Sequence, residues 1–310
     1  PHFIAGREFR PRGRRRGATL IPSIRPTSFI RGIVLFPLVG VVAETRALDC
    51  NNNGLPDDQD IANCDGSEWC RDCNGNGIPD GCDVFPEGMV SIPAGSFDMG
   101  DHHDGRSDAP VHTVYIDAFL MDRYEVTNQQ YADALNWAYA QGGLIEATNG
   151  VVYEAGSGTS YPYCSTTTSS GYSRITWNGS TFGVVGQELP TGDLGNKTRH
   201  PMVMVSWYGA AAYANWRSAM HGRTPSYDTS TWACNFSATG YRLPTEAEWE
   251  KAARGGLHDP YRRYPWGDTV DHSSANYWNS DDPFEGTWPG TPETTPVGYY
   301  NGGQAPPSVD

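Results

Sequence analysis

The sequence predicts a globular fold in which short helices and short strands are joined by many loops. Its 310 residues include 36 Gly, 17 Tyr and 10 Trp, and 38% are hydrophobic, which is typical of a loop-rich chain with few long helices. Three stretches carry a helix start signal, at Thr127, Ser206 and Thr245. Several short stretches alternate apolar and polar residues, as strands do. We therefore expect helices of a few turns packed against small sheets.

The most complete helix signal lies in Gly240–Gly256. Thr245 is a good N-cap, and Glu248 lies three residues later, where its carboxylate can reach back to the cap amide. Gly255 supplies a left-handed stop. An apolar stripe at helical spacing is formed by Trp249, Ala252 and Ala253. The stretch is expected to build the fold rather than to carry chemistry.

Two further helices are predicted in the same way. Thr127 is an N-cap with Gln130 at its third helical position, and Ser206 caps the next helix. The buried stripe of the first is expected to be Tyr131, Ala134, Leu135 and Ala138. The buried stripe of the second is expected to be Ala212, Tyr213 and Trp216.

Strand signals surround these helices. Met89–Gly100 predicts a strand, a turn and a second strand, and Val111–Asp117 alternates as a strand. Residues 140–200 are rich in Gly, Ser, Thr and Tyr, with strand-like pieces at Gly150–Tyr153 and Arg174–Gly183. We interpret this region as an insertion of short strands and loops.

The chain divides into three parts: a basic leader over residues 1–47, two loop repeats over residues 48–86, and one larger domain over residues 88–310. Residues 1–48 hold nine Arg and two Glu, a net charge of +7, which leaves −21 of the total of −14 for the rest. Because binding to phosphates needs Lys and Arg, the acidic body excludes a nucleic-acid partner.

The leader has the pattern of a secretory signal peptide. Arg-rich sequence ending at Arg31 precedes the apolar run Ile33–Ala43, and small residues suited to cleavage lie at Ala43 and Ala47. Pro37 interrupts this run, which is short for a membrane span. We expect a secreted or extracytoplasmic protein; the alternative is an uncleaved leader that anchors it in a membrane.

Residues 49–83 contain two copies of a twelve-residue loop with a period of 23 residues. Positions 1, 3, 5, 9 and 12 carry side-chain oxygens, position 6 is Gly, and position 7 offers a carbonyl. This is the ligand pattern of a calcium loop. The predicted ligands are Asp49, Asn51, Asn53, Leu55, Asp57 and Asp60 in the first copy and Asp72, Asn74, Asn76, Ile78, Asp80 and Asp83 in the second.

These loops resemble thrombospondin type 3 and dockerin-like calcium repeats more than helix-flanked EF-hands. Because no helix signals flank them, we expect a stiff, calcium-bound spacer rather than a sensor. The alternative is a turn-rich linker that binds no metal.

Seven cysteines agree with an exported protein, in which disulfides form. Five of them cluster in the repeat region, and the odd count leaves one thiol unassigned. Cys164 and Cys234 stand apart from the cluster, and we expect them to form a bridge.

Six pieces in the larger domain resemble, in order, the formylglycine-generating enzyme or sulfatase-modifying factor family, over about 70% of the chain. They are Met89-Val-Ser-Ile-Pro-Ala-Gly-Ser-Phe-Asp-Met-Gly, Tyr124-Glu-Val-Thr-Asn-Gln-Gln-Tyr, His200-Pro-Met-Val-Met-Val-Ser-Trp-Tyr, Gly240-Tyr-Arg-Leu-Pro-Thr-Glu-Ala-Glu-Trp-Glu, Tyr264-Pro-Trp-Gly and Ala275-Asn-Tyr-Trp. The resemblance implies an α+β fold with little regular secondary structure, related to C-type lectin-like domains. It also implies oxidation of a sulfatase cysteine to formylglycine, with O₂ as oxidant and copper held by two cysteines.

The family also binds calcium, and Asn276 with the carbonyl of Tyr277 matches the start of one such site. Asp281 and Asp282 are further oxygen ligands inferred from their nearness. The family's later motifs and its catalytic cysteine pair are expected beyond Asp310, so the domain is expected to be C-terminally truncated. Ala214 stands where many relatives carry Cys, and Gly209 where many carry Asp.

Two functions remain open. The first is a secreted formylglycine-generating-enzyme-like oxidoreductase whose active-site segment is absent from this chain, with an unfolded sulfatase or another exported protein as partner. The alternative is a non-catalytic extracellular binding module on the same fold, stabilised by calcium. An unrelated calcium-binding adhesin would explain residues 49–84 alone, and no nucleophile motif supports a hydrolase.

Overall fold

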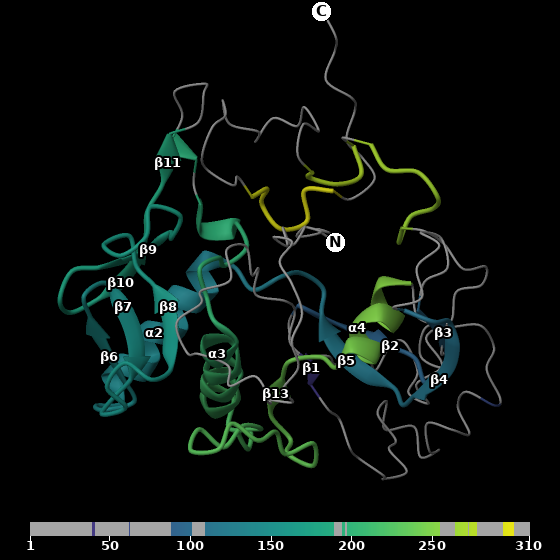
Figure 1. Cartoon of the computed structure of the whole chain (residues 1–310), viewed down its shortest axis with the longest axis horizontal. Coiled ribbons are helices and arrows are strands. Elements are labelled where there is room, and N and C mark those ends of the chain that lie inside the picture. Colours follow the sequence, from purple (N-terminus) through teal and green to yellow (C-terminus); the bar gives the residue numbers. More distant parts are fainter. Residues whose placement is uncertain are drawn as a thin grey trace, which may run out of the picture.

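The computed structural model describes residues 39–40, 62, 88–100, 109–188, 194–195, 197–254, 264–271, 273–277 and 294–300. Short helices and small antiparallel sheets make up this part of the chain, which confirms the expected mixture of helix and sheet. Helix α3 (Trp207–Met220) separates two groups of elements: α2 with β6 to β10, and α4 with β2 to β5 (Figure 1). None of the helices described is long and apolar enough to cross a bilayer.

Helices α2 (Asn128–Ala140) and α3 begin at the predicted caps. The Thr127 hydroxyl accepts a hydrogen bond from the Gln130 amide, and the Gln130 side chain accepts one from the Thr127 amide. The Ser206 hydroxyl accepts from the Gly209 amide at 3.1 Å. Both predicted apolar stripes are buried, so the helical spacing identified the correct faces.

Gly209 has no side chain, which lets α3 lie close both to Tyr131 of α2 and to the backbone at Tyr163. The rings of Tyr131 and Tyr213 stack with their centroids 5.4 Å apart, and the Tyr131 hydroxyl donates to the Gly209 carbonyl at 3.2 Å. A Cβ on Gly209 would lie 2.1 Å from the Tyr163 carbonyl oxygen. Residue 209 therefore admits no acidic side chain in this packing.

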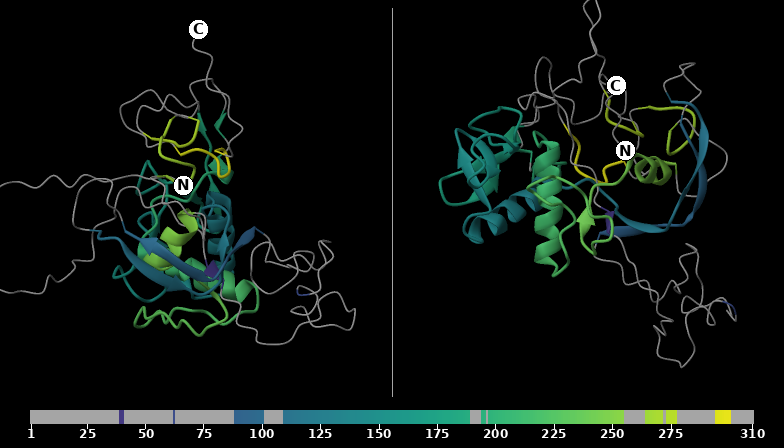
Figure 2. Two further views of the ribbon diagram at one scale, coloured as in Figure 1. Left: turned by 90° about the vertical axis from the view of Figure 1, so that its right-hand side faces the viewer. Right: turned by 60° about the horizontal axis from the view of Figure 1, so that its bottom comes forward.

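A four-stranded antiparallel sheet runs in the order β13-β1-β5-β2. Its strands are β1 (Val39–Gly40), β2 (Met89–Ile92), β5 (Phe119–Asp122) and β13 (Tyr241–Arg242). All four residues of β5 are buried, and Phe119 and Met121 form a small core with Ala252 of α4. Strand β1 comes from the predicted leader and joins segments more than 80 residues away (Figures 1 and 2).

The remaining strands form smaller sheets. Strands β3 (Gly95–Met99) and β4 (His112–Ile116) form a hairpin, and β6 (Ile145–Thr148), β7 (Val151–Glu154) and β8 (Pro162–Ser165) form a three-stranded sheet. The other pairs are β9 (Ile175–Trp177) with β10 (Phe182–Val184) and β11 (Gln187–Glu188) with β12 (Leu194–Gly195), followed by the 3-10 turn η2 (Lys197–Arg199). Strands predicted in residues 89–117 and in the insertion are confirmed, although β2 and β3 belong to different sheets.

The predicted apolar stripe of α4 (Glu246–Ala253) is half-buried at Trp249, Ala252 and Ala253, and Ala252 packs against the core of Phe119 and Met121. The two buried residues of the helix, Glu248 and Lys251, are charged and were not predicted to be buried. The reason is that charged partners and carbonyl oxygens lie under this helix and compensate the two buried charges. The predicted stop at Gly255 lies outside the described residues.

Candidate functional site

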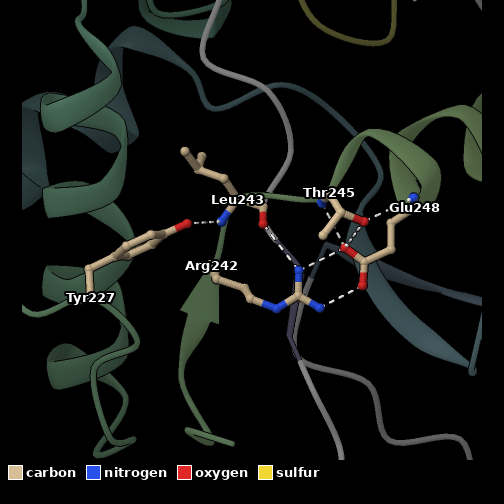
Figure 3. Close-up of polar contacts among 5 residues, drawn as sticks. All are labelled: Tyr227, Arg242, Leu243, Thr245 and Glu248. Atoms are coloured by element: carbon tan, nitrogen blue, oxygen red, sulfur yellow. Dashed lines mark hydrogen bonds and ion pairs between the residues drawn. The ribbon is translucent and has the colours of Figure 1, made fainter. Parts of the chain in front are cut away.

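Arg242 and Glu248 form a buried ion pair where β13 leads into α4 (Figure 3). One guanidinium nitrogen donates to Glu248 Oε2 at 2.7 Å and the other to Oε1 at 2.5 Å. Their side chains are 6% and 9% exposed. Both charges are therefore largely removed from water and depend on each other.

The capping box completes this arrangement. Glu248 Oε2 also accepts from the Thr245 amide at 2.7 Å, and the Thr245 hydroxyl accepts from the Glu248 amide at 3.2 Å. Burial acts to raise the pKa of Glu248, but the hydrogen bonds from Arg242 and Thr245 outweigh it and lower the pKa below its usual value. Glu248 is thus a fixed anion with no proton to exchange near neutral pH, and it serves as framework.

Tyr227 holds the other side of the junction. Its hydroxyl accepts from the Leu243 amide at 3.0 Å, and burial raises the pKa of Tyr227 to about 12 (Figure 3). The guanidinium of Arg242 lies 5.0 Å from the ring centroid of Phe236. These contacts fix the position of β13 around a neutral Tyr227 and a charge-paired Arg242, neither of which is poised for acid–base catalysis.

Lys251 fastens the far end of the same helix. Its ammonium donates to the carbonyls of Pro93, Gly95 and Ile116 at 2.6, 2.9 and 3.3 Å. Burial lowers the pKa of Lys251. The side chain ties α4 to the corner between β2 and β3 and to the end of β4.

The expected Cys164–Cys234 bridge is wrong, because both thiols are free. Cys164 is fully buried on β8, where it forms a hydrogen bond with Tyr131, and burial raises its pKa to about 12. Cys234 lies opposite Tyr227 in an isolated β-bridge, and burial raises its pKa too. Each thiol therefore lies beside a different tyrosine, and the two cysteines are not bonded to each other.

The copper site that the resemblance implies requires two thiolates. Cys164 and Cys234 do not fit it as a pair, because Cys164 is fully buried beside Tyr131 whereas Cys234 lies opposite Tyr227 in an isolated β-bridge. Ala214, where many relatives carry Cys, is fully buried. The described residues therefore supply no copper-binding pair, and no reaction step through copper is assigned to them.

The predicted calcium ligands lie almost wholly outside the described residues. All twelve predicted ligands of the two loops between Asp49 and Asp83 lie outside them, and so do Asp281 and Asp282. Asn276 is half-buried and Tyr277 is 37% exposed, at adjacent positions after the buried Ala275. Within the described segments, no group of three or more His, Cys, Asp or Glu side chains is arranged to hold a metal.

An aromatic cluster at the start of α3 was not anticipated from the sequence. It consists of Tyr161, Trp207, Tyr208 and Trp232. The ring centroid of Tyr208 lies 4.8 Å from that of Tyr161 and 4.9 Å from that of Trp232, and Trp207 is 45% exposed. The adjacent aromatic pair just after the Ser206 cap, outside the buried stripe, is the signal that could have indicated it. Such a cluster can bind apolar or cationic groups.

The family model described as sulfatase-modifying factor enzyme 1-like domain matches residues 80–304. The formylglycine-generating enzyme of Thermomonospora curvata is 32% identical over 225 residues, covering 69% of this chain and 65% of that protein. The mouse (Mus musculus) formylglycine-generating enzyme is 32% identical over 220 residues, covering 65% of this chain and 51% of that protein. The chain thus spans between half and two thirds of these relatives' length.

Two other matches have different names. The serine/threonine-protein kinase pkn1 of Chlamydia caviae is 28% identical over 212 residues, covering 68% of this chain and 24% of that protein. The solved structure of CarF covers 64% of this chain and 69% of its own, at 26% identity and a TM-score of 0.42. With the family model matching well over half of the residues, and with the predicted motifs in place at both capping boxes, the chain belongs to the sulfatase-modifying factor family.

Proposed function

We propose that this chain carries the framework of a secreted, formylglycine-generating-enzyme-like protein, whose implied activity is oxidation of a sulfatase cysteine to formylglycine. The observation that carries this proposal is the match of residues 80–304 to the sulfatase-modifying factor family, together with relatives named formylglycine-generating enzyme at 32% identity. The partner would be an unfolded sulfatase or another exported protein. The oxidant would be O₂, and any copper that supports the oxidation would have to be held by thiols other than Cys164 and Cys234.

A non-catalytic binding module is the second candidate, and the aromatic cluster favours it. Trp207 exposes 45% of its surface beside Tyr208 and Trp232. Stacked and edge-to-face aromatic rings offer a large, rigid contact surface. This chain also matches 24% of the length of a protein named as a kinase. Similar domains therefore occur in proteins that are named for different activities.

Calcium and export belong to the proposal as well. The two loops between Asp49 and Asp83 repeat the same ligand spacing, which supports calcium as a bound cation. The apolar run Ile33–Ala43 after an Arg-rich stretch supports export. The relation to C-type lectin-like domains and the incompleteness of the domain stay predictions.

Binding of a sulfatase peptide tests the proposed function. A fluorescent peptide that contains the cysteine to be oxidised, and a matched peptide with Ala in its place, would be titrated with the full chain. Saturable binding that weakens on loss of the cysteine supports the enzyme-like function. Binding indifferent to the cysteine, but lost in Trp207→Ala and kept in Tyr139→Ala, supports the binding module instead, since Tyr139 is an equally exposed aromatic (40%) on another helix. No binding to either peptide contradicts the sulfatase partner.

A further inference from the structure

Strand β1 fills a gap between two strands that come from other parts of the chain. Val39 pairs with Arg242 of β13 on one side and with Met121 of β5 on the other. Gly40 likewise pairs with Tyr241 and Leu120. In the order of the described sheet, β13 and β5 are thus connected through two residues of the predicted leader (Figure 1).

Strand β13, on one side of this gap, is held in place by contacts that do not involve the leader. The Tyr241 amide donates to the Ser218 hydroxyl at 2.7 Å, and the Tyr241 hydroxyl lies 2.8 Å from His221 Nδ1. The next residue, Arg242, is held by its ion pair with Glu248. Helices α3 and α4 therefore determine where β13 lies.

Strand β5, on the other side of the gap, is also held in place without the leader. Strand β5 pairs with β2 over four residue pairs, from Met89 opposite Asp122 to Ile92 opposite Phe119. Asp122 also accepts a 2.5 Å bond from Arg217 of α3. Strands β13 and β5 therefore both contact α3. The space between them has the width of one strand, because a single strand pairs with both.

The backbone that faces this gap has to be paired. All four residues of β5 and both residues of β13 are buried. Buried backbone N–H and C=O groups are almost always hydrogen-bonded, and leaving one without a partner is destabilising. Without a strand between them, β5 and β13 would each present an edge of unpaired backbone groups.

We propose that the gap between β5 and β13 is a strand-binding site and that its occupant is the chain's own segment at Val39–Gly40. The leader then forms part of the folded sheet. Cleavage of the folded chain at Ala43 or Ala47 would leave this strand bound without a covalent link. Recognition would be by backbone pairing, as when an extended peptide adds to a sheet edge. The inference does not depend on the proposed enzymatic function.

The test uses the full chain with a specific protease site placed between Ala43 and Ala47. The chain is folded first, then cut, and native mass spectrometry reports whether the leader fragment stays bound. We expect the fragment to remain with the body. We also expect Gly40→Pro, which removes a backbone N–H from β1, to release it at least tenfold faster. Leu35→Pro, in the same leader but outside β1, is the matched control and should leave retention unchanged.

Hydrogen exchange of the uncut, unsubstituted chain gives a second measurement that does not depend on a variant's folding. Peptides covering Phe119–Asp122 and Tyr241–Arg242 should be as protected as the sheet of β6 to β8, and both should lose protection together once the leader has dissociated. Immediate release of the wild-type fragment, with unchanged protection of both peptides, would overturn the proposal. So would equal retention of the Gly40→Pro and wild-type fragments.

Discussion

Arg242 and Glu248 are six residues apart in the chain and make two hydrogen bonds to each other, at 2.7 and 2.5 Å, with both side chains at least nine-tenths buried. The pair joins the end of β13 to the first turn of α4. Glu248 also completes the capping box with Thr245. The Glu248 carboxylate therefore holds together the end of the strand, the turn and the start of the helix in this segment.

The first prediction concerns this pair. Glu248→Gln should lower the free energy of unfolding by about 3–5 kcal/mol, because it leaves the buried Arg242 charge without a counter-ion. Urea denaturation measures the change. Glu246→Gln is the matched control: Glu246 lies in the same first turn but is exposed, so it should change stability by less than about 0.5 kcal/mol.

The same pair predicts a pH dependence. The pKa of Glu248 is lower in the folded chain than in the unfolded chain. Its contribution is therefore fully present above the unfolded carboxyl value of about 4.3 and is lost as the pH falls through the lower folded value. The stability difference between wild type and Glu248→Gln should shrink below about pH 4. A difference that stays constant from pH 7 to the acid limit would refute the lowered pKa.

Gly209 gives a second prediction. Gly209→Ala should destabilise the protein by about 3 kcal/mol or more, although alanine is the better helix former, because its Cβ would lie 2.1 Å from the Tyr163 carbonyl oxygen. Thermal or urea unfolding measures it. Gly171→Ala is the control, since a Cβ there meets nothing within 4 Å, and it should be nearly neutral. Equal stability of both variants would contradict the close packing of α3 against β8.

The free thiols give a third prediction. Under native conditions iodoacetamide should modify Cys234 faster than Cys164, because Cys234 is half-buried and Cys164 is fully buried. Both should react slowly, since their raised pKa values leave little thiolate. Peptide mass spectrometry with and without urea measures the rates. Recovery of a disulfide-linked peptide containing both cysteines would show that the free state is wrong.

Calcium removal gives a fourth prediction. EDTA should lower the melting temperature, because a cation bound to the folded state adds stability by mass action, about 2.7 kcal/mol at 100 times its Kd. Added Ca²⁺ should reverse the change, and Asp49→Asn with Asp72→Asn should reduce it. An EDTA-treated chain that melts at the original temperature would exclude calcium as a stabilising ligand.

Much of the helical structure could be predicted from local chemistry. A cap, a polar residue at the third position and an apolar stripe depend on neighbours along the chain, so α2, with its cap at Thr127, was located correctly. Helix α4 was located correctly too, but the burial of its two charged residues was not predicted. Burial of Glu248 and Lys251 depends on Arg242 and on carbonyls more than 130 residues away, which local spacing does not encode.

Long-range pairing explains the other differences. All four residues of β5 are buried, so this strand lacks the alternation that marks a half-buried strand, and the sequence pattern did not predict it. The sequence placed Val39–Gly40 in a signal peptide, and its pairing with β13 depends on residues some 200 positions later. The Cys164–Cys234 bridge was inferred from elimination, whereas tyrosine neighbours determine the state of each thiol. The aromatic cluster also combines three separate segments.

The central claim is that the described residues provide the framework of a sulfatase-modifying factor domain and that Cys164 and Cys234 do not catalyse oxidation. The most direct measurement is aldehyde formation on a sulfatase cysteine peptide incubated with the full chain, Cu(I) and O₂, followed by mass spectrometry. The account predicts no aldehyde that depends on either thiol. Formation of aldehyde that is lost in Cys164→Ser or Cys234→Ser would contradict it.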